Sequence, residues 1–202
     1  MDRTVREAER FNFQPPLEPC RKVHDRMRAT ICGLGLDSES NAFTQSFGGR
    51  ELDASLPLIP LVGFLRADDP QVRGTVASIE QLPMIGGLAL RYRAKTDVDV
   101  LAPGEGVFVS RSPWLANNYK LQDQDAKACA LFKRLFSPSN DVGPVAEDYY
   151  PTAQRQLGSF PRAFSHRTLI GLALSLNDTG PAQQRGQRGK VASQCLDAEG
   201  QC

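Results

Sequence analysis

GPVAEDYYPTAQRQLGSFPRAFSH, residues 143–166, is the stretch on which the interpretation of this chain depends. An acidic pair, Glu147 and Asp148, is followed by two tyrosines, a turn and a Ser-Phe-Pro sequence typical of a helix start. A carboxylate that faces a sugar ring can activate water, and tyrosines offer a hydroxyl and a ring wall. The same pattern also fits an acidic surface turn before a helix, so the pattern alone leaves both interpretations open.

A second candidate segment is PGEGVFVSRSPW, residues 103–114, where Glu105 stands between two glycines and Trp114, the only tryptophan, follows nine residues later. Flanking glycines let the backbone come close to a ligand. A lone tryptophan is more often part of a core, however, and one loop glutamate is most simply a solvated charge. The role of Asp53 is equally undecided, because the helix dipole alone explains an acidic residue in a first helical turn.

The spacing of apolar residues predicts a helical protein. Helices are expected over residues 20–34, 51–65, 70–82, 112–120, 124–136 and 161–176. Asp69 and Pro70 provide an N-cap and an N1 proline for the third of these. Pro57 and Pro60 interrupt the second, so that helix must kink or begin late. Short extended pieces are expected near residues 42–50 and 88–92, and the helices are joined by long glycine-rich loops.

Composition and charge exclude several classes of function. The chain has 202 residues, 41% of them hydrophobic, and a net charge of +1, which gives no electrostatic footprint for nucleic acid or an anionic membrane. No stretch approaches about 18 consecutive apolar residues and the first residues are charged, so a soluble, cytoplasmic protein is expected. The five cysteines lack a CxxC pair and the two histidines are far apart, so neither a metal site nor a cofactor is expected.

The chain divides into one domain and a tail. Residues 1–176 carry the helical pattern and are interpreted as a single domain. Residues 177–202 have few large apolar side chains and many Gly, Gln and Arg residues, so a disordered tail is expected there. The last ordered helix should therefore end near Leu176.

Eight segments of the chain form a characteristic series. In order along the sequence they are AERF, FTQSFGGRELDASLPLIPLVGF, DDPQVRGTVASIE, LALRYR, PGEGVF, SPWLA, ALFKRLFSPSNDVG and AEDYYPTAQRQLGSFPRAFSH. Together they resemble the C-terminal half of the catalytic domain of glycoside hydrolase family 15, which includes glucoamylases and some bacterial trehalases. The resemblance covers about residues 8–176. It implies an all-α fold, a partial (α/α)6 toroid of the six-hairpin glycosidase type with about half of its helices present.

The resemblance also implies a reaction. The family works by inversion, in which one carboxylic acid protonates the glycosidic oxygen and a second carboxylate, roughly 6.5–9.5 Å away, activates water on the opposite face. Glu147 matches the base, while Glu105, Trp114 and Asp53 match positions at the sugar-binding end. The implied substrates are maltooligosaccharides, starch ends or trehalose. For His166, which closes the matching segment, a structural role at the helix start is at least as well supported as a ligand role.

Several features depart from the family pattern. Pro57 replaces a leucine, Arg111 stands where a small residue or a cysteine is common, and Tyr150 replaces an acidic residue. The family's general acid lies upstream of the AERF-like helix, so this chain is expected to supply only the base half of the site. The alternative is an inactive truncated remnant, or a module that binds a saccharide or a partner. A partial toroid leaves apolar helix faces bare, so the expected partner is a missing N-terminal portion or a second copy.

The resemblance makes one geometric expectation. Glu147, Glu105, Trp114 and Asp53 should converge at one mouth of the partial toroid, as a concave sugar site requires. Glu147 should point into an open groove beside Trp114, with no buried Arg or Lys neutralising it, because a base must reach water. A structural ion pair on Glu147 would count against its catalytic role.

Overall fold

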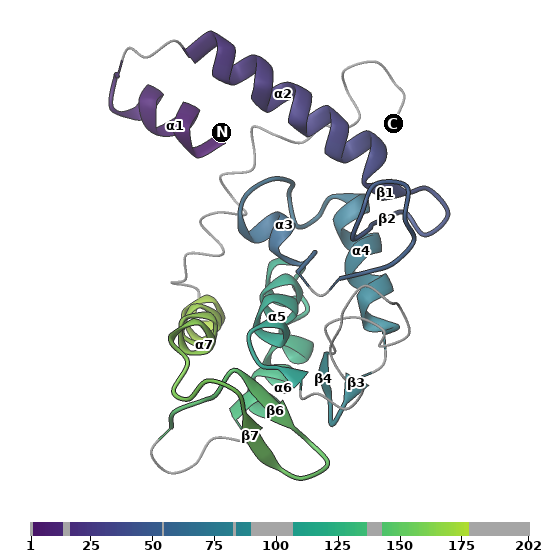
Figure 1. Cartoon of the computed structure of the whole chain (residues 1–202), viewed down its shortest axis with the longest axis vertical. Helices are drawn as coiled ribbons and strands as arrows, with labels where there is room; N and C mark the ends of the chain where they lie inside the picture. The colour runs from purple at the N-terminus through teal and green to yellow at the C-terminus, as the bar shows by residue number, and fades with distance from the viewer. Residues whose placement is uncertain are drawn as a thin grey trace.

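The structure is a computed structural model that describes residues 2–13, 17–53, 55–82, 84–89, 107–136 and 143–177. These ranges are mainly helical (Figure 1). The helices are α1 (Asp2–Arg10), α2 (Leu17–Leu34), α3 (Leu58–Leu61), α4 (Pro70–Glu80), α5 (Arg111–Leu121), α6 (Asp125–Phe136) and α7 (Ala163–Leu176). The predictions for α2, α4, α5, α6 and α7 are confirmed to within a few residues, including the end of α7 at Leu176. No helix within these ranges is both long and apolar enough to span a bilayer.

The expectation of an all-α fold is wrong in part, because the described residues also contain strands. These are β1 (Leu36–Asp37), β2 (Ala42–Phe43), β3 (Met84–Ile85), β4 (Leu88–Ala89), β5 (Val107–Phe108), β6 (Asp148–Tyr150) and β7 (Arg155–Leu157). Antiparallel pairing makes two hairpins, β1-β2 and β3-β4, and a three-stranded sheet in the order β5-β6-β7. Tyr149 and Tyr150 favour extended structure, and Tyr149 is buried between half-buried neighbours, as in a strand with one face in the core.

The helix expected over residues 51–65 begins late, as its two prolines predicted, and it is much shorter than expected. The helix α3 begins only after Pro57 and ends at Leu61, because proline cannot donate a backbone hydrogen bond within a helix. The Pro57 ring is fully buried, and its carbonyl accepts a hydrogen bond of 2.7 Å from Nδ2 of Asn118 in α5. Asp53 consequently lies in a loop, so the helix dipole does not explain the presence of this acid.

The main core surrounds α5, against which α3, α6 and α7 all pack (Figure 1). Buried side chains from α4 to α7 and from three of the strands form one cluster, which includes Val76, Ile79, Leu88, Val107, Leu115, Leu131, Leu135, Tyr149, Leu169 and Leu172. Because Val107 of β5 and Tyr149 of β6 belong to this cluster, the sheet is held against the helices by apolar packing. The sheet is therefore part of the folded core.

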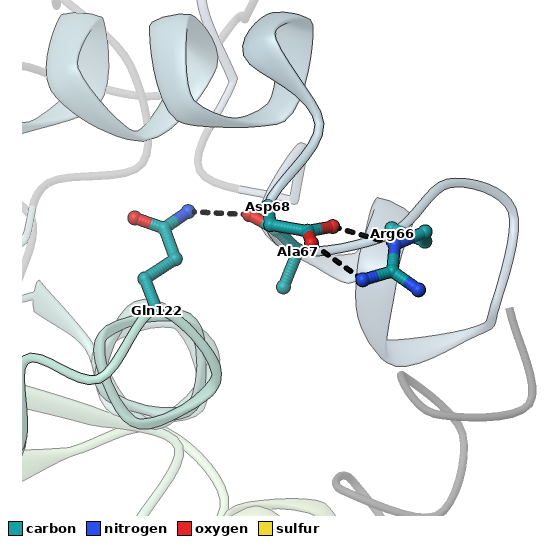
Figure 2. A network of polar contacts seen from close by, with 4 residues as sticks. All are labelled: Arg66, Ala67, Asp68 and Gln122. Atoms are coloured by element: carbon teal, nitrogen blue, oxygen red, sulfur yellow. Dashed lines mark hydrogen bonds and ion pairs between the residues drawn. The ribbon is translucent and has the colours of Figure 1, made fainter. Parts of the chain in front are cut away.

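A polar contact fixes the loop between α3 and α4 to the end of α5 (Figure 2). The Gln122 side chain, just past α5, donates from Nε2 to the Ala67 carbonyl oxygen at 3.1 Å. Beside it, Arg66 donates two hydrogen bonds to Asp68, and the guanidinium holds the pKa of that carboxyl below its usual value. The exposed ion pair stabilises little. The contact that joins two elements is therefore the Gln122 hydrogen bond.

The pair α1 and α2 packs together beside the core (Figure 1). An ion pair of 2.5 Å between Arg21 and Glu9 connects the two helices. The apolar stripe that the sequence places on α2, which includes Val23, Met27 and Leu34, is exposed along most of its length. Ile31 of the same helix packs against the small core cluster of Phe43, Leu65 and Val72, but the described residues leave most of the stripe uncovered.

We predict that Gly74→Ala destabilises the fold. A Cβ at Gly74 in α4 would lie 2.1 Å from the Asn41 carbonyl oxygen, so the backbone must shift, at a cost of roughly 1–3 kcal/mol of unfolding free energy. The matched control is Gly33→Ala in α2, where the new Cβ meets nothing within 4 Å. Alanine there should stabilise by about 0.5–1 kcal/mol. Denaturant unfolding measures the change in unfolding free energy for both variants. If Gly74→Ala stabilised the protein as much as Gly33→Ala, the close packing of α4 against Asn41 would be contradicted.

Candidate active site

Glu147 immediately precedes β6, the middle strand of the three-stranded sheet. Its N–H donates to the Ser159 carbonyl oxygen at 3.0 Å, and its carbonyl oxygen accepts from the Val109 N–H at 3.0 Å. Val109 continues β5 on one side, and Ser159 follows β7 on the other. Both backbone polar groups of Glu147 are therefore satisfied, and its main chain is fixed from two directions.

Two side chains fix the residues that lead into this strand. Gln156 of β7 accepts a hydrogen bond of 2.6 Å from the Ala146 N–H through Oε1. His166 of α7 accepts one of 3.3 Å from the Val145 N–H through Nε2, and its Nδ1 lies 2.8 Å from the Arg162 carbonyl oxygen. We assign the ring hydrogen to Nδ1, which lets both contacts form. Of the two roles that the sequence leaves open for His166, the structure supports the structural one.

The Glu147 carboxylate is paired with an arginine. Nη1 of Arg162 lies 2.6 Å from Oε2, and the Ser159 N–H donates to the same oxygen over a longer distance of 3.4 Å. Arg162 is half-buried, not buried as the expectation specified, but its ion pair with Glu147 counts against a catalytic role for this acid. The cause is a backbone contact between the segments that precede α7 and β6: the Arg162 N–H donates to the Val145 carbonyl oxygen, which brings this arginine beside the acid. The side chains are 33% (Arg162) and 27% (Glu147) exposed, so the pair lies at the edge of the fold.

The Asp53 carboxylate also forms an ion pair with an arginine, and this pair is more deeply buried. Its Oδ2 lies 3.8 Å from Nη1 of Arg111, with side-chain exposures of 15% for the acid and 7% for the arginine. Its Oδ1 accepts a hydrogen bond of 2.7 Å from the Ser55 N–H. Arg111 is one of the positions that depart from the family pattern. The departure thus introduces a positive charge next to a residue expected to bind sugar.

Phe108 at the end of β5 connects the two ion pairs. The guanidinium carbon of Arg111 lies 5.1 Å from the centre of its ring, and that of Arg162 lies 5.9 Å away. Both distances allow a cation–π attraction. Asp53 and Glu147, far apart in the sequence, are therefore joined through two arginines and a single aromatic ring.

Trp114 reaches the same ring through a second aromatic residue. Phe164 of α7 lies 6.3 Å from Phe108 and 6.0 Å from Trp114 between ring centres, edge-on to the tryptophan. Such contacts are favourable for aromatic pairs. The sequence pattern alone does not indicate that Phe108, Phe164 and Arg162 belong to the site. The available signal was their position inside the segments PGEGVF and SFPRAF, next to the candidate acids.

Glu105, the remaining candidate, lies outside the described residues, and its role stays a prediction. Within the described ranges no group of three or more His, Cys, Asp and Glu side chains could hold a metal ion. The site as described therefore consists of two acid–arginine pairs and three aromatic rings.

Trp114 also borders a groove of about 270 Å³ between α3, α5 and α7. We call it the α3/α5/α7 groove. Its lining residues are Leu58, Leu61, Val62, Trp114, Asn117, Arg167, Thr168, Ile170, Gly171 and Leu174. Glu147 is not among them. The groove is therefore a separate feature, and the expected opening beside Glu147 stays a prediction.

Comparison with known proteins identifies the family. Residues 1–174 match the family described as Glycosyl hydrolases family 15, and the chain belongs to this family. A trehalase from Mycobacterium tuberculosis is 38% identical over 170 residues, which cover 84% of this chain and 25% of that protein. A trehalase from Thermoplasma volcanium is 28% identical over 178 residues, covering 88% and 28%. The chain thus spans about a quarter of the length of these relatives.

Solved structures support the fold. A wild-type glycosidase and a glycosidase variant in complex with glucose each superpose with a TM-score of 0.67 at 21% sequence identity. The match covers 81% of this chain and 46% of either glycosidase. At this level of identity the likeness establishes the glycosidase fold of the matched part.

We predict that Gly158→Ala disturbs Glu147. A Cβ at Gly158 would lie 3.0 Å from the Glu147 Cβ and 3.2 Å from Oε2, and the φ of +76° disfavours any L side chain. We expect a loss of about 1–2 kcal/mol from the backbone, with a further loss from the contact. Gly143→Ala is the matched control, with a φ of +84° and nothing within 4 Å. Equal losses of unfolding free energy in the two variants would show that Gly158 does not support the carboxylate.

Proposed function

We propose that this chain forms the base-bearing part of a glycoside hydrolase site for α-glucosidic bonds, in trehalose or at the ends of maltooligosaccharides and starch. Glu147 is the base that activates water, and a carboxylic acid from another part of the enzyme protonates the leaving oxygen, with inversion at the sugar carbon. The helices form part of an (α/α)6 toroid. Family membership and the trehalase relatives support this proposal.

The main support for the proposal is that two aromatic rings link three of the residues that the sequence offered as site candidates. Asp53, Trp114 and Glu147 come from a loop, a helix and the start of a strand, and contacts through Phe108 and Phe164 bring them together. Unrelated surface charges on a helical domain have no physical reason to gather around one aromatic cluster. A few polar groups beside aromatic walls are the usual composition of a sugar site.

The contacts of Glu147 leave one oxygen for chemistry. Arg162 and the Ser159 N–H both bind Oε2, whereas Oε1 has no hydrogen bond or ion pair with the part of the chain that the structure describes. Because the ion pair engages Oε2, the carboxylate cannot act as a base through both oxygens. The proposal therefore requires Oε1 to accept the proton from water. Nε of Arg162 is buried without a hydrogen-bond partner among the same residues, so a sugar oxygen can accept from it only if the arginine side chain moves.

A second function, saccharide or partner binding without cleavage, is favoured by the two ion pairs. Arg111, at a position where the family commonly has a small residue or cysteine, lies 3.8 Å from Oδ2 of Asp53, where its charge competes with a sugar hydroxyl for this acid. Arg162 does the same for one oxygen of Glu147. Both acids can then hold a ligand only through their remaining oxygens, which supports weak binding more readily than turnover.

We predict that the purified chain alone shows no detectable hydrolysis of trehalose or maltose. One carboxylate cannot both protonate the leaving oxygen and activate water in an inverting site. Release of glucose over long incubation is the measurement. Turnover that disappears in Glu147→Gln would show that this chain contains a complete site, and would overturn the half-site proposal.

We predict that Glu147 is essential once the rest of the enzyme is present. In a chimera, residues of this chain replace the matching 170 residues of the Mycobacterium tuberculosis trehalase. Glu147→Gln should lower its kcat on trehalose by about 10²–10⁴-fold. Glu39→Gln is the control, because Glu39 forms a well-exposed ion pair with Arg50. A folded chimera that is inactive, and that gains hydrolysis on Arg111→Ser, would instead favour the binding function.

A further inference from the structure

His166 closes a circuit of hydrogen bonds between α7 and the segment before Glu147. Its Nε2 accepts from the Val145 N–H at 3.3 Å, and its Nδ1 lies 2.8 Å from the Arg162 carbonyl oxygen. The Arg162 N–H donates in turn to the Val145 carbonyl oxygen at 3.0 Å. Three contacts therefore connect Val145, Arg162 and His166 in a ring, and both polar backbone groups of Val145 belong to it.

The circuit joins the two segments that carry the Glu147–Arg162 ion pair. Val145 lies two residues before Glu147, and Arg162 supplies the guanidinium nitrogen that lies 2.6 Å from Oε2. His166 contacts backbone groups on both sides, so it acts on the pair through the main chain. Without its contact to the Val145 N–H, Val145 would be joined to the start of α7 by a single hydrogen bond among the described residues.

The number of hydrogens on the His166 ring decides whether the circuit can form. A neutral imidazole has one N–H donor and one nitrogen that accepts. With its hydrogen on Nδ1, the ring donates to the Arg162 carbonyl oxygen and accepts from the Val145 N–H. A second hydrogen, on Nε2, would set two donors against each other and leave the Val145 N–H without its acceptor. The circuit is therefore complete only while the ring is neutral.

The charged groups around this end of α7 differ from histidine in how they titrate. The helices and strands packed against α7, and the loops that lead into them, carry carboxylates, lysines and arginines. These are Asp53, Arg111, Lys120, Asp125, Lys127, Lys133, Arg134, Glu147, Asp148, Arg155 and Arg162, with Arg167 on α7 itself. Such groups ordinarily keep their charge between about pH 5 and 8, whereas histidine changes its charge there. The chain contains one other histidine, His24, which lies on α2.

We propose that His166 is a positioning residue for the Glu147–Arg162 pair and that it acts only as the neutral ring. Protonation of Nε2 releases the segment that carries Glu147 from the start of α7. The role in catalysis rests on the proposed function of Glu147, whereas the coupling between the ring and the backbone does not. The ring itself contacts only backbone groups in this circuit, so it is not a catalytic residue.

Two amide substitutions separate the two contacts of the ring. His166→Gln places an amide oxygen at about the reach of Nε2, so it can accept from the Val145 N–H without titrating. His166→Asn can replace Nδ1 as a donor to the Arg162 carbonyl oxygen, but it has no group in the place of Nε2. His24→Gln is the matched control, because it removes the other histidine, whose Nδ1 contacts the exposed Asp25 carboxylate.

Amide hydrogen exchange in the full 202-residue chain, without substrate, tests the coupling. The protection of the Val145 N–H is measured by NMR between about pH 7.5 and 5.5 and corrected for the intrinsic exchange rate, while the ring nitrogen shifts report the charge of His166. Protection should fall about tenfold as the ring becomes charged. The His24→Gln chain should show the same fall. His166→Gln should keep its protection at both pH values, and His166→Asn should have low protection at both.

Catalysis gives a second readout in the chimera with the Mycobacterium tuberculosis trehalase. The kcat of the His166→Gln chimera, divided by that of the parent chimera, should be near one at about pH 7.5 and should rise threefold or more, in round numbers, at about pH 5.5. The same ratio for His24→Gln should stay near one at both. A chimera that is inactive, or that Glu147→Gln leaves fully active, would contradict the proposed function, and the exchange result would then decide the positioning role alone.

Three results would overturn the positioning role. The first is a neutral His166 ring whose hydrogen lies on Nε2, as shown by its nitrogen shifts. The second is protection of the Val145 N–H that stays constant while the ring becomes charged. The third is an equal pH-dependent loss of protection in His166→Gln, because the titrating group would then lie elsewhere. If His166→Asn fails to fold, the parent chain and His166→Gln still distinguish these results from the expected ones.

Discussion

The hydrogen bonds that hold the Glu147 backbone between Val109 and Ser159 are the constraint on which the candidate site depends. They join the extension of β5 to the start of β6 and to the loop before α7, and the β5 segment is distant in the sequence from the other two. This junction sets Phe108 between Arg111 and Arg162. The core residues Val107 and Tyr149 then press the sheet onto α5 and α7, so apolar packing stabilises the geometry of a polar site.

The electrostatics of the site follow from two arginines placed beside two acids. The Asp53–Arg111 pair is largely enclosed, so its attraction is little screened but its desolvation cost is high. The Glu147–Arg162 pair lies nearer solvent, and within the described residues both contacts of the carboxylate are made by the same oxygen, Oε2. Family membership suggests catalysis, while the two neutralised acids suggest binding. The difference between these functions depends on whether the arginines stay in place when a sugar enters.

The sequence predicted the helices well because their signals are local, as at Asp69, whose side chain caps α4 by accepting from the Gln71 N–H. It missed the sheet because the pairing of Val107 with Tyr149 joins residues that no local pattern connects. It offered Asp53, Trp114 and Glu147 as candidate site residues through the family resemblance, but it did not predict the ion pairs. Arg162 reaches Glu147 only because the loop with Gly158 folds back against the carboxylate, and that is a tertiary contact.

The position of Phe108 between two guanidinium groups has a consequence for ligand binding. If the proposed sugar site is correct, a sugar hydroxyl that displaced Arg111 from Asp53 would change the contact of that arginine with the ring that Arg162 also touches. The affinities of the two acids for a ligand would consequently be thermodynamically linked, although no atom of one touches the other. In such a site, the occupancy of one sugar-binding position sets the availability of the next.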